Sequence, residues 1–274
     1  MRPLTSARNP QLKLLRTLAN KRARREQRLM VAEGEDLVVA GLEHGVAPVV
    51  VFVDAEREGE ITDLLERLAG VGEAYAVPRQ LLASASQLAA PPRVVAILPQ
   101  PGPYSFGDVA FPPSLGVWLA GVADPGNVGT LVRSAVALGA DWVALGPGSA
   151  DPYHPRATRA AMGATFAIPL MEGVRGEDLA ARGGFRIVAA VVAGGRAPWH
   201  ADLRGPTVIA LGGEREGLGP GLAQLGDALE IERVTIPQAP GAESLNVAAA
   251  GAILLAEAVR QRNAGEIGSA GPVA

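Results

Sequence analysis

Five short apolar runs, separated by turns and by helical or loop segments, occupy the second half of this 274-residue chain. The runs are LGVWLAGV (115–122), DWVALGPG (141–148), FRIVAAVV (185–192), PTVIALGG (206–213) and LEIERVTI (229–236). Apolar runs without strict alternation are typical of strands that are covered on both faces, and such strands pair mostly in parallel. The sequence therefore predicts an α/β fold with a mostly parallel sheet in this half.

Glycine-containing segments follow three of these runs, at the edge where a parallel sheet binds its ligands. They read DPGNVGTLVRSA (124–135), LGGEREGLGPG (211–221) and IPQAPGAESLNVAAAGAILLAEAV (236–259). Glycine lacks a Cβ, so the backbone of such a segment can approach a ligand closely. The first segment is typical of a tight turn that enters a helix. We therefore expect one ligand site where these strands end.

Several common kinds of site do not match these segments. A phosphate-binding loop needs GxxxxGK followed by Ser or Thr, and a dinucleotide site needs GxGxxG with an acidic residue downstream. Neither pattern occurs in the chain, and the GxSxG elbow of hydrolases is absent too. The chain has no Cys, and its three His lie far apart at positions 44, 154 and 200, so we expect no metal site.

Taken together, the three segments resemble the motifs of the SpoU/TrmH family of RNA ribose 2′-O-methyltransferases, within the SPOUT superfamily. The matching residues are Asn127, Gly129, Arg133, Ser134 and Ala135 in the first motif, Gly212, Glu214 and Gly217 in the second, and Ile236, Pro237, Ser244, Leu245, Asn246 and Val247 in the third. The segment DPYHPRATRAAMGATFAIPL (151–170) is also similar to the family. The resemblance covers residues 114–262.

The resemblance implies a fold and an activity. The fold is a SPOUT domain in which the segment after Ile236 threads a loop to form a trefoil knot, and two such domains pair as a homodimer. The activity is methyl transfer from S-adenosylmethionine to a ribose 2′-hydroxyl of structured RNA, with 23S rRNA favoured over tRNA. The residues implied to hold the cofactor are Leu211, Gly212, Gly213, Ile236 and Leu245.

The implied catalytic residues are Arg133, Asn127, Glu214, Ser244 and Asn246. Methyl transfer is an in-line displacement that depends mainly on positioning and needs no metal. Arg133 is expected to grip a phosphate and to stabilise the developing 2′-alkoxide. The family's alternative role for it is proton acceptor, which suits a guanidinium poorly because that group holds its proton tightly. Asn127 is expected to orient Arg133 or the ribose, and Glu214 to fix one of them.

The first half predicts a separate small α/β domain. Helical spacing covers 10–27, and buried strands are expected at 47–54 and 92–100. The Pro- and Gly-rich stretch that follows is typical of a linker. We divide the chain into an RNA-binding domain (1–100), a linker (101–114), a methyltransferase domain (115–265) and a flexible tail (266–274). The first domain resembles the L30e-like domain that precedes the catalytic domain in rRNA-directed members.

Positive charge is concentrated at the N-terminus, although the chain has a formal net charge of −3. Residues 1–30 contain nine basic residues and one acid, Glu26. A basic patch on an acidic protein suggests a polyanionic partner, since phosphate contacts release counterions. The residues expected to contact RNA are Arg16, Lys21, Arg22, Arg24, Arg25 and Arg28. A solvated helix face is the alternative interpretation.

Other functions remain open from the sequence. A non-catalytic RNA-binding member of the fold, a tRNA methyltransferase and an unrelated nucleotide-binding protein would each use similar turns. The chain contains no apolar run of the length that a membrane span needs, and its start lacks the apolar core of a signal peptide. We therefore expect a cytoplasmic protein without a membrane partner.

Overall fold

The computed structural model describes residues 1–86, 88, 92–214, 216–226, 228–242 and 244–265, and these form two compact units. The first unit contains Met1–Gly102 and Asp151–Ala167, and the second contains Pro103–Ala150 and the chain from Ile168 onward. The segment Asp151–Ala167 thus packs with the first unit, whereas the sequence-based division placed it in the methyltransferase domain. The predicted tail, 266–274, lies outside the described residues.

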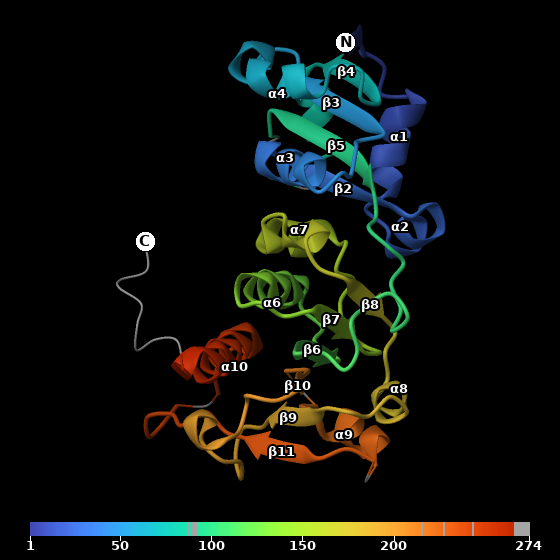
Figure 1. Cartoon of the computed structure of the whole chain (residues 1–274). Coiled ribbons are helices and arrows are strands. Elements are labelled where there is room, and N and C mark those ends of the chain that lie inside the picture. The colour runs from blue at the N-terminus through green and yellow to red at the C-terminus, as the bar shows by residue number, and fades with distance from the viewer. Residues whose placement is uncertain (87, 89–91, 215, 227, 243, 266–274) are drawn as a thin grey trace. The chain divides into compact units, whose positions relative to one another are not determined.

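A five-stranded mixed sheet forms the centre of the first unit (Figure 1). Its strands are β1 (Arg2–Pro3), β2 (Leu29–Glu33), β3 (Val50–Asp54), β4 (Glu73–Val77) and β5 (Val94–Pro99), in the order β1-β4-β3-β5-β2. Strand β5 is antiparallel to both of its neighbours, and the other pairs are parallel. The helices are α1 (Pro10–Thr17), α2 (Lys21–Gln27), α3 (Glu35–Glu43), α4 (Thr62–Arg67), α5 (Arg79–Ala83) and α7 (Pro155–Ala161), with short 3-10 turns at Glu58–Glu60 and Ala164–Phe166.

The N-terminal helix predicted over 10–27 is two helices. Helix α1 ends at Thr17, and Asn20 starts α2 by accepting a 2.8 Å hydrogen bond from the Arg22 backbone N–H. Asn is a favoured N-cap because its side chain satisfies a backbone donor that the helix leaves unpaired. The break changes which of the basic side chains share a helix face.

A six-stranded sheet, parallel throughout, forms the centre of the second unit, so the mostly parallel sheet predicted from the apolar runs is confirmed. Its strands are β6 (Leu115–Ala120), β7 (Trp142–Leu145), β8 (Leu170–Glu172), β9 (Arg186–Ala190), β10 (Thr207–Gly212) and β11 (Ile231–Val234), in the order β11-β9-β10-β6-β7-β8. The helices are α6 (Pro125–Ala137), α8 (Gly176–Ala180), α9 (Gly219–Leu225) and α10 (Val247–Arg262), with 3-10 turns at Pro198–His200 and Asn263–Gly265. Of the described helices, none is long and apolar enough to cross a membrane.

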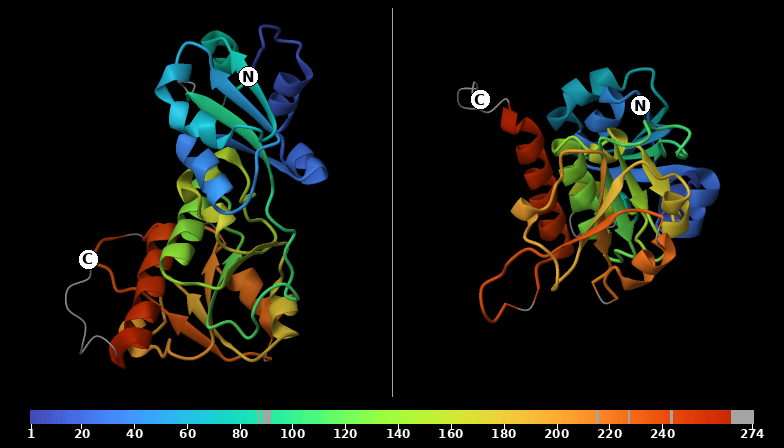
Figure 2. Two further views of the ribbon diagram at one scale, coloured as in Figure 1. Left: turned by 45° about the horizontal axis from the view of Figure 1, so that its top comes forward. Right: turned by 60° about the horizontal axis from the view of Figure 1, so that its bottom comes forward.

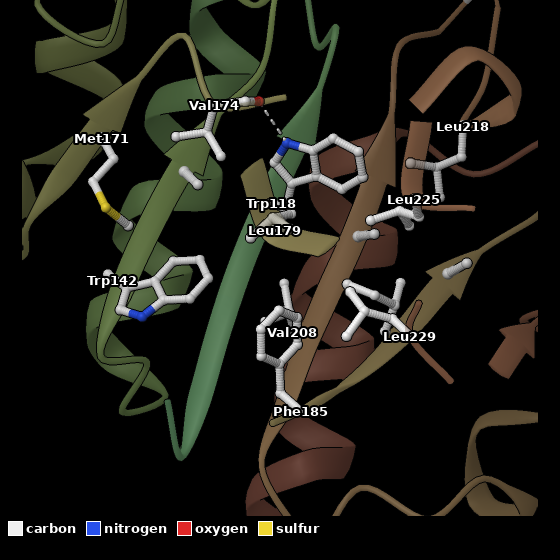
Figure 3. Close-up of a cluster of buried hydrophobic side chains, with 14 residues drawn as sticks. Trp118, Trp142, Met171, Val174, Leu179, Phe185, Val208, Leu218, Leu225 and Leu229 are labelled. Carbon is white, nitrogen blue, oxygen red and sulfur yellow. Dashed lines mark hydrogen bonds between the residues drawn. The ribbon is translucent and has the colours of Figure 1, made fainter. Parts of the chain in front are cut away.

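Helices cover both faces of this second sheet, α6 and α10 on one side and α8 and α9 on the other (Figure 2). The α8/α9 side holds a cluster of buried side chains that includes Trp118, Trp142 and Leu225 (Figure 3). On the α6/α10 side, Gly251 permits close packing, because a Cβ there would lie 2.3 Å from Leu131 Cδ2. The small residues of α10 therefore bring that helix directly onto α6 and β10.

The predicted linker, 101–114, packs onto the core of the second unit. The Phe106 ring meets the Trp142 ring edge to face at a centroid distance of 6.0 Å, and Phe111 meets Phe185 in the same way at 5.5 Å. Such pairs add to the stabilisation that burial of the rings gives. Aromatic residues inside a Pro- and Gly-rich stretch thus fix its path across the domain that it precedes.

Candidate active site

Two neighbouring strands bring the first two motifs together. Strands β6 and β10 pair in parallel with Leu119 opposite Leu211 and Ala120 opposite Gly212, so both end at the same edge of the sheet. Beyond this register, the Gly213 N–H donates a 3.1 Å hydrogen bond to the Ala120 carbonyl. A tight turn follows, closed by a 2.9 Å bond from the Gly217 N–H to the Gly213 carbonyl. This turn presents Glu214 beside the start of α6.

A chain of hydrogen bonds links one residue from each of the three motifs. The Asn127 Nδ2 donates to Glu214 Oε1 at 2.7 Å, and the Asn246 Nδ2 donates to Asn127 Oδ1 at 3.0 Å. Asn246 also caps α10, since its Oδ1 accepts from the backbone N–H of Ala248 at 2.8 Å. Both polar atoms of the Asn127 side chain are therefore engaged, which fixes the amide in one orientation.

The first hollow, as we call it, has a volume of about 550 Å³ and lies between the ends of β9 and β10 and the start of α10. Its lining includes all five residues predicted to hold a cofactor: Leu211, Gly212, Gly213, Ile236 and Leu245. Glu214, Ser244 and Asn246 line it as well. The lining is largely apolar, and none of its described residues carries a positive charge. This combination fits a nucleoside with a cationic sulfonium and does not suit a polyphosphate.

The glycines of the second motif are needed for close contact between backbone segments. A Cβ at Gly212 would lie 2.2 Å from the Gly217 carbonyl carbon, and one at Gly213 would lie 2.4 Å from the Gly121 oxygen. The sequence alone suggests that these glycines let a ligand approach the backbone. The structure gives a different reason: the turn folds back on β10 and touches the end of β6.

Comparisons with known proteins agree with this geometry. Residues 114–256 match the SpoU rRNA Methylase family, and residues 9–96 match the MRM3-like substrate binding domain. The chain belongs to the SpoU rRNA methylase family. It is 31% identical to the 23S rRNA (uridine(2479)-2′-O)-methyltransferase of Streptomyces viridochromogenes, over 90% of this chain and 87% of the relative. It is 28% identical to the 23S rRNA (guanosine(2553)-2′-O)-methyltransferase RlmP of Bacillus subtilis, over 93% of this chain and 98% of that one.

Solved structures of SpoU methyltransferases share the fold over nearly the whole chain. AviRb from Streptomyces viridochromogenes, in complex with the cofactor AdoMet, superposes with a TM-score of 0.82 at 29% identity, covering 93% of this chain and 98% of that one. An rRNA methyltransferase from Sinorhizobium meliloti gives a TM-score of 0.81 at 31% identity, covering 94% and 97%. The SpoU fold inferred from the motifs is therefore confirmed.

Two predicted catalytic residues of this SpoU protein occupy unexpected positions. Arg133 is exposed on α6 and does not line the first hollow. It is also absent from the lining of a second hollow, which lies between the ends of β6, β7 and β10 and the start of α9. It follows Asn127 by six residues, so the two side chains leave the helix in different directions. Ser244 lies in the lining of the first hollow, and the last helix is capped two residues further on by Asn246.

Sequence reasoning missed Asp124 as a part of the site. Its side chain is the N-cap of α6 and accepts a 3.0 Å hydrogen bond from the Asn127 backbone N–H. The signal was present, because Asp followed by Pro is a common helix start. Asn127 consequently lies within the first turn of α6.

Among the residues expected to contact RNA, Arg24 is a correction. Its side chain is 1% exposed and forms a 2.6 Å ion pair with Asp151, which is 3% exposed. It also donates to the carbonyls of Leu18 and Ala19 at 2.8 and 2.9 Å. Arg24 therefore holds the first unit together and is not available to a phosphate.

The other basic residues of this segment differ in exposure. Lys21, Arg22 and Arg25 are exposed on α2, and Arg22 pairs with Glu26 at 2.6 Å. Arg16 is half-buried and donates to the Ala7 carbonyl and the Ser84 hydroxyl, each at 3.0 Å. Arg28 is also half-buried. The basic surface is thus centred on α2.

Proposed function

We propose that this protein transfers a methyl group from S-adenosylmethionine to a ribose 2′-hydroxyl of rRNA. The observation that carries the proposal is the hydrogen-bond chain Glu214–Asn127–Asn246, which joins all three motifs beside the first hollow. Support comes from the two 23S rRNA 2′-O-methyltransferases that resemble the chain over most of its length. The MRM3-like substrate binding domain supports an RNA substrate as well.

The residues of the first hollow suit the proposed cofactor. When bound, S-adenosylmethionine supplies a methyl group on a positively charged sulfur. Leu211, Ile236 and Leu245 provide the apolar surface for a nucleoside, and the Glu214 carboxylate attracts the positive charge. In the transfer, a bond would form between the 2′-oxygen and the methyl carbon as the carbon–sulfur bond breaks, with the neutral thioether S-adenosylhomocysteine as the leaving group and the hydroxyl proton released to water.

Asn127 and Glu214 position the acceptor ribose. The Glu214 carboxylate lies at the boundary of the first hollow and is held by the Asn127 amide, so its oxygens are pre-oriented. We assign to it the acceptance of the hydrogen bond from the 2′-hydroxyl, which directs an oxygen lone pair at the methyl group. Most of the rate enhancement then comes from this alignment, as expected for a displacement without a metal.

We also propose a homodimer in which Arg133 acts at the partner's site. Arg133 is exposed and lines neither hollow of its own chain. On the adjacent helix α10, Ala249, Ile253 and Ala256 form an exposed apolar stripe at helical spacing, and Ile253 is 41% exposed. A two-fold contact through α6 and α10 would cover the stripe and carry each Arg133 toward the other chain.

A mixing experiment tests the dimer proposal. The Arg133→Ala variant keeps its first hollow, and an Ala250→Trp variant, which blocks that hollow, keeps its Arg133. If the two act across a dimer, mixing the inactive variants restores about one quarter of the wild-type activity, since half of the exchanged dimers carry one complete site. A mixture that stays inactive after demonstrated subunit exchange contradicts action across the dimer.

The resemblance further leads us to propose a trefoil knot after Ile236 and a cytoplasmic location. The close packing of Gly251 against Leu131 and Leu211 supports a tightly threaded last segment. An experimental structure whose chain path is unknotted when the two termini are extended would contradict the knot. Recovery of the protein in the membrane fraction of cells would contradict the location.

The activity itself is tested with rRNA from cells that lack the protein and with methyl-labelled S-adenosylmethionine. We expect label in a 2′-O-methylated nucleotide of the rRNA. Transfer to a base nitrogen or carbon, or no transfer to rRNA, would contradict the proposal. A thermal-shift comparison separates the cofactors, since S-adenosylmethionine should raise the melting temperature and ATP should not.

A further inference from the structure

The second hollow, as we call it, opens at the same sheet edge as the first hollow and has a volume of about 950 Å³. It lies between the ends of β6, β7 and β10 and the start of α9, all within the second unit. The two hollows share the lining residues Gly213, Glu214, Glu216 and Gly217, so both glutamates border both hollows. A group in the second hollow is therefore next to the site where we place the methyl group.

Hydrogen bonds and close packing hold the walls of the second hollow in place. The buried Trp118 indole N–H donates a 3.1 Å hydrogen bond to the Val174 carbonyl, which fixes the ring (Figure 3). Gly221 lies against this ring, since a Cβ there would lie 2.9 Å from Trp118 Cη2. The Gln224 side-chain oxygen, also in the lining, accepts a 3.1 Å hydrogen bond from the Gly176 N–H, which fixes this amide. A pre-formed hollow loses little conformational entropy when a ligand binds.

The side chains that line the second hollow carry negative charge, which disfavours an anionic ligand. Asp124, Glu214 and Glu216 contribute carboxylates, and none of the described lining residues is Lys or Arg. An ionised carboxylate accepts hydrogen bonds and cannot donate them. A phosphate, or the carboxylate of an amino acid, would meet like charge there. A planar base with N–H groups on its edge could instead donate hydrogen bonds to these carboxylates. Its faces could lie against the Gly and Pro residues of the lining.

We propose that the second hollow receives the base of the nucleotide whose 2′-hydroxyl is methylated, unstacked from the RNA and read by N–H donation to these carboxylates. The inference rests on the proposed function, because it needs the ribose at Glu214. With the base in the second hollow and the cofactor in the first, the ribose lies over the shared turn between them. Enzymes that do chemistry on a base take it out of the stack into a pocket, and we infer the same movement here because it would expose the ribose hydroxyl.

Filling the second hollow tests the inference. Ala123 is exposed, lines the second hollow and is absent from the lining of the first, so Ala123→Trp obstructs only the second. We expect the Kd for S-adenosylmethionine, measured by calorimetry, to stay within about twofold while kcat/KM for rRNA falls ~10²-fold or more. The matched control is Ala181→Trp, an exposed position that lines neither hollow and should leave both quantities unchanged.

A second variant, Pro147→Trp, obstructs the hollow from the β7 side and covers the case in which Ala123→Trp fails to fold. Normal methylation by a folded variant would overturn the inference. Loss of S-adenosylmethionine binding would overturn it too, because it would place part of the cofactor in the second hollow. Absence of rRNA methylation by the wild-type protein, in contrast, would be a failure of the proposed function itself.

Discussion

The Asn127 side-chain amide donates a 2.7 Å hydrogen bond to the Glu214 carboxylate, across 87 residues of sequence. Asn246 donates to the same Asn127 side chain from the start of α10. Three motifs that are separate in the sequence thus meet at one amide. Because the amide has one donor side and one acceptor side, it sets the orientation of both neighbours.

Replacing Asn127 by Asp should therefore impair catalysis with little loss of cofactor binding. The substitution removes the N–H donor and places a carboxylate against Glu214, so that the two like charges repel. We expect turnover to fall ~10²-fold or more, since misplacement of a positioning group commonly costs that much. The readouts are single-turnover methylation and calorimetric titration of S-adenosylmethionine. Thr130→Ala, one turn along α6, is the control, and equal activity of the two variants would contradict the positioning role.

Arg133→Ala should reduce turnover by ~10²-fold or more and leave cofactor affinity nearly intact, as expected of a contact made in the transition state. The side chain lies outside the lining of the first hollow, which supports the second part of this expectation. Arg133→Lys keeps a positive charge but loses the bidentate geometry, so we expect it to recover only part of the activity. Wild-type methylation by Arg133→Ala would refute the assignment.

Breaking the ion pair between Arg24 and Asp151 should strongly destabilise the first unit. Both side chains are almost fully buried, so Asp151→Asn leaves a buried guanidinium without its counter-charge. We expect a loss of about 3–5 kcal/mol in the free energy of unfolding, measured with urea. The exposed pair Arg22–Glu26 is the comparison, and Arg22→Gln should cost less than about 1 kcal/mol. Similar losses from both substitutions would contradict this account.

RNA binding should depend on the exposed cations of α2. Changing Lys21, Arg22 and Arg25 to Gln removes three exposed charges and leaves the buried Arg24 in place. Each lost phosphate contact should reduce the slope of log K against log salt by ~0.7–0.9. Filter binding to rRNA over a range of salt concentrations measures the slope, with calorimetric cofactor affinity as the internal control. An unchanged slope would return α2 to the interpretation of a solvated helix face.

The first unit should lose stability in mild acid because of His154. Burial, followed by repulsion from Arg24, lowers the pKa of His154 below its ordinary value of 6.5. Its Nδ1 accepts a 3.1 Å hydrogen bond from the Arg156 backbone N–H, which requires that this nitrogen carry no proton. Arg156 and Arg159 also repel the charged imidazole, and Asp151 opposes the shift.

Since the unfolded chain then binds the proton more readily, the stability that neutral His154 contributes is complete above its unfolded pKa and declines as the pH falls below 6.5. His154→Asn keeps an acceptor at this N-cap and removes the titration. Melting temperatures between about pH 8 and pH 5.5 should therefore fall less steeply for His154→Asn than for the wild type. Equal slopes would show that another group is responsible.

Much of the fold of the second unit follows from local patterns in the sequence. Five of its six strands coincide with apolar runs, and four of these, β6, β7, β9 and β10, are buried along nearly their whole length. Strand β11 lies at the edge of the sheet and is partly exposed. Strand β8 is only three residues long, Leu170–Glu172, and too short to produce a pattern. Asp151–Ala167 packs with the first unit through contacts between residues far apart in sequence, among them the ion pairs Arg24–Asp151 and Glu33–Arg159, which no local pattern can reveal.

The site was partly predictable for the same reason. Asn127 and Glu214 follow the adjacent parallel strands β6 and β10, so their meeting could be expected. Asn246 follows β11, which neighbours neither strand, so its contact with Asn127 could not. Burial of Arg24 could not, since its neighbours on α2 are exposed and carry the same charge. The close contact of Gly213 with Gly121 could not be predicted either. A glycine in a turn can be required by the turn itself, by a ligand or by a neighbouring segment, and the sequence does not distinguish these reasons.

Mapping of 2′-O-methylribose in rRNA tests the central claim most directly. Mass spectrometry of rRNA from cells with the gene, cells without it, and cells that express only Asn127→Asp compares the same nucleotides in three backgrounds. The account predicts one 2′-O-methylated rRNA nucleotide that is present in the first and lost or strongly reduced in the other two. Identical 2′-O-methylation of rRNA in all three would contradict it.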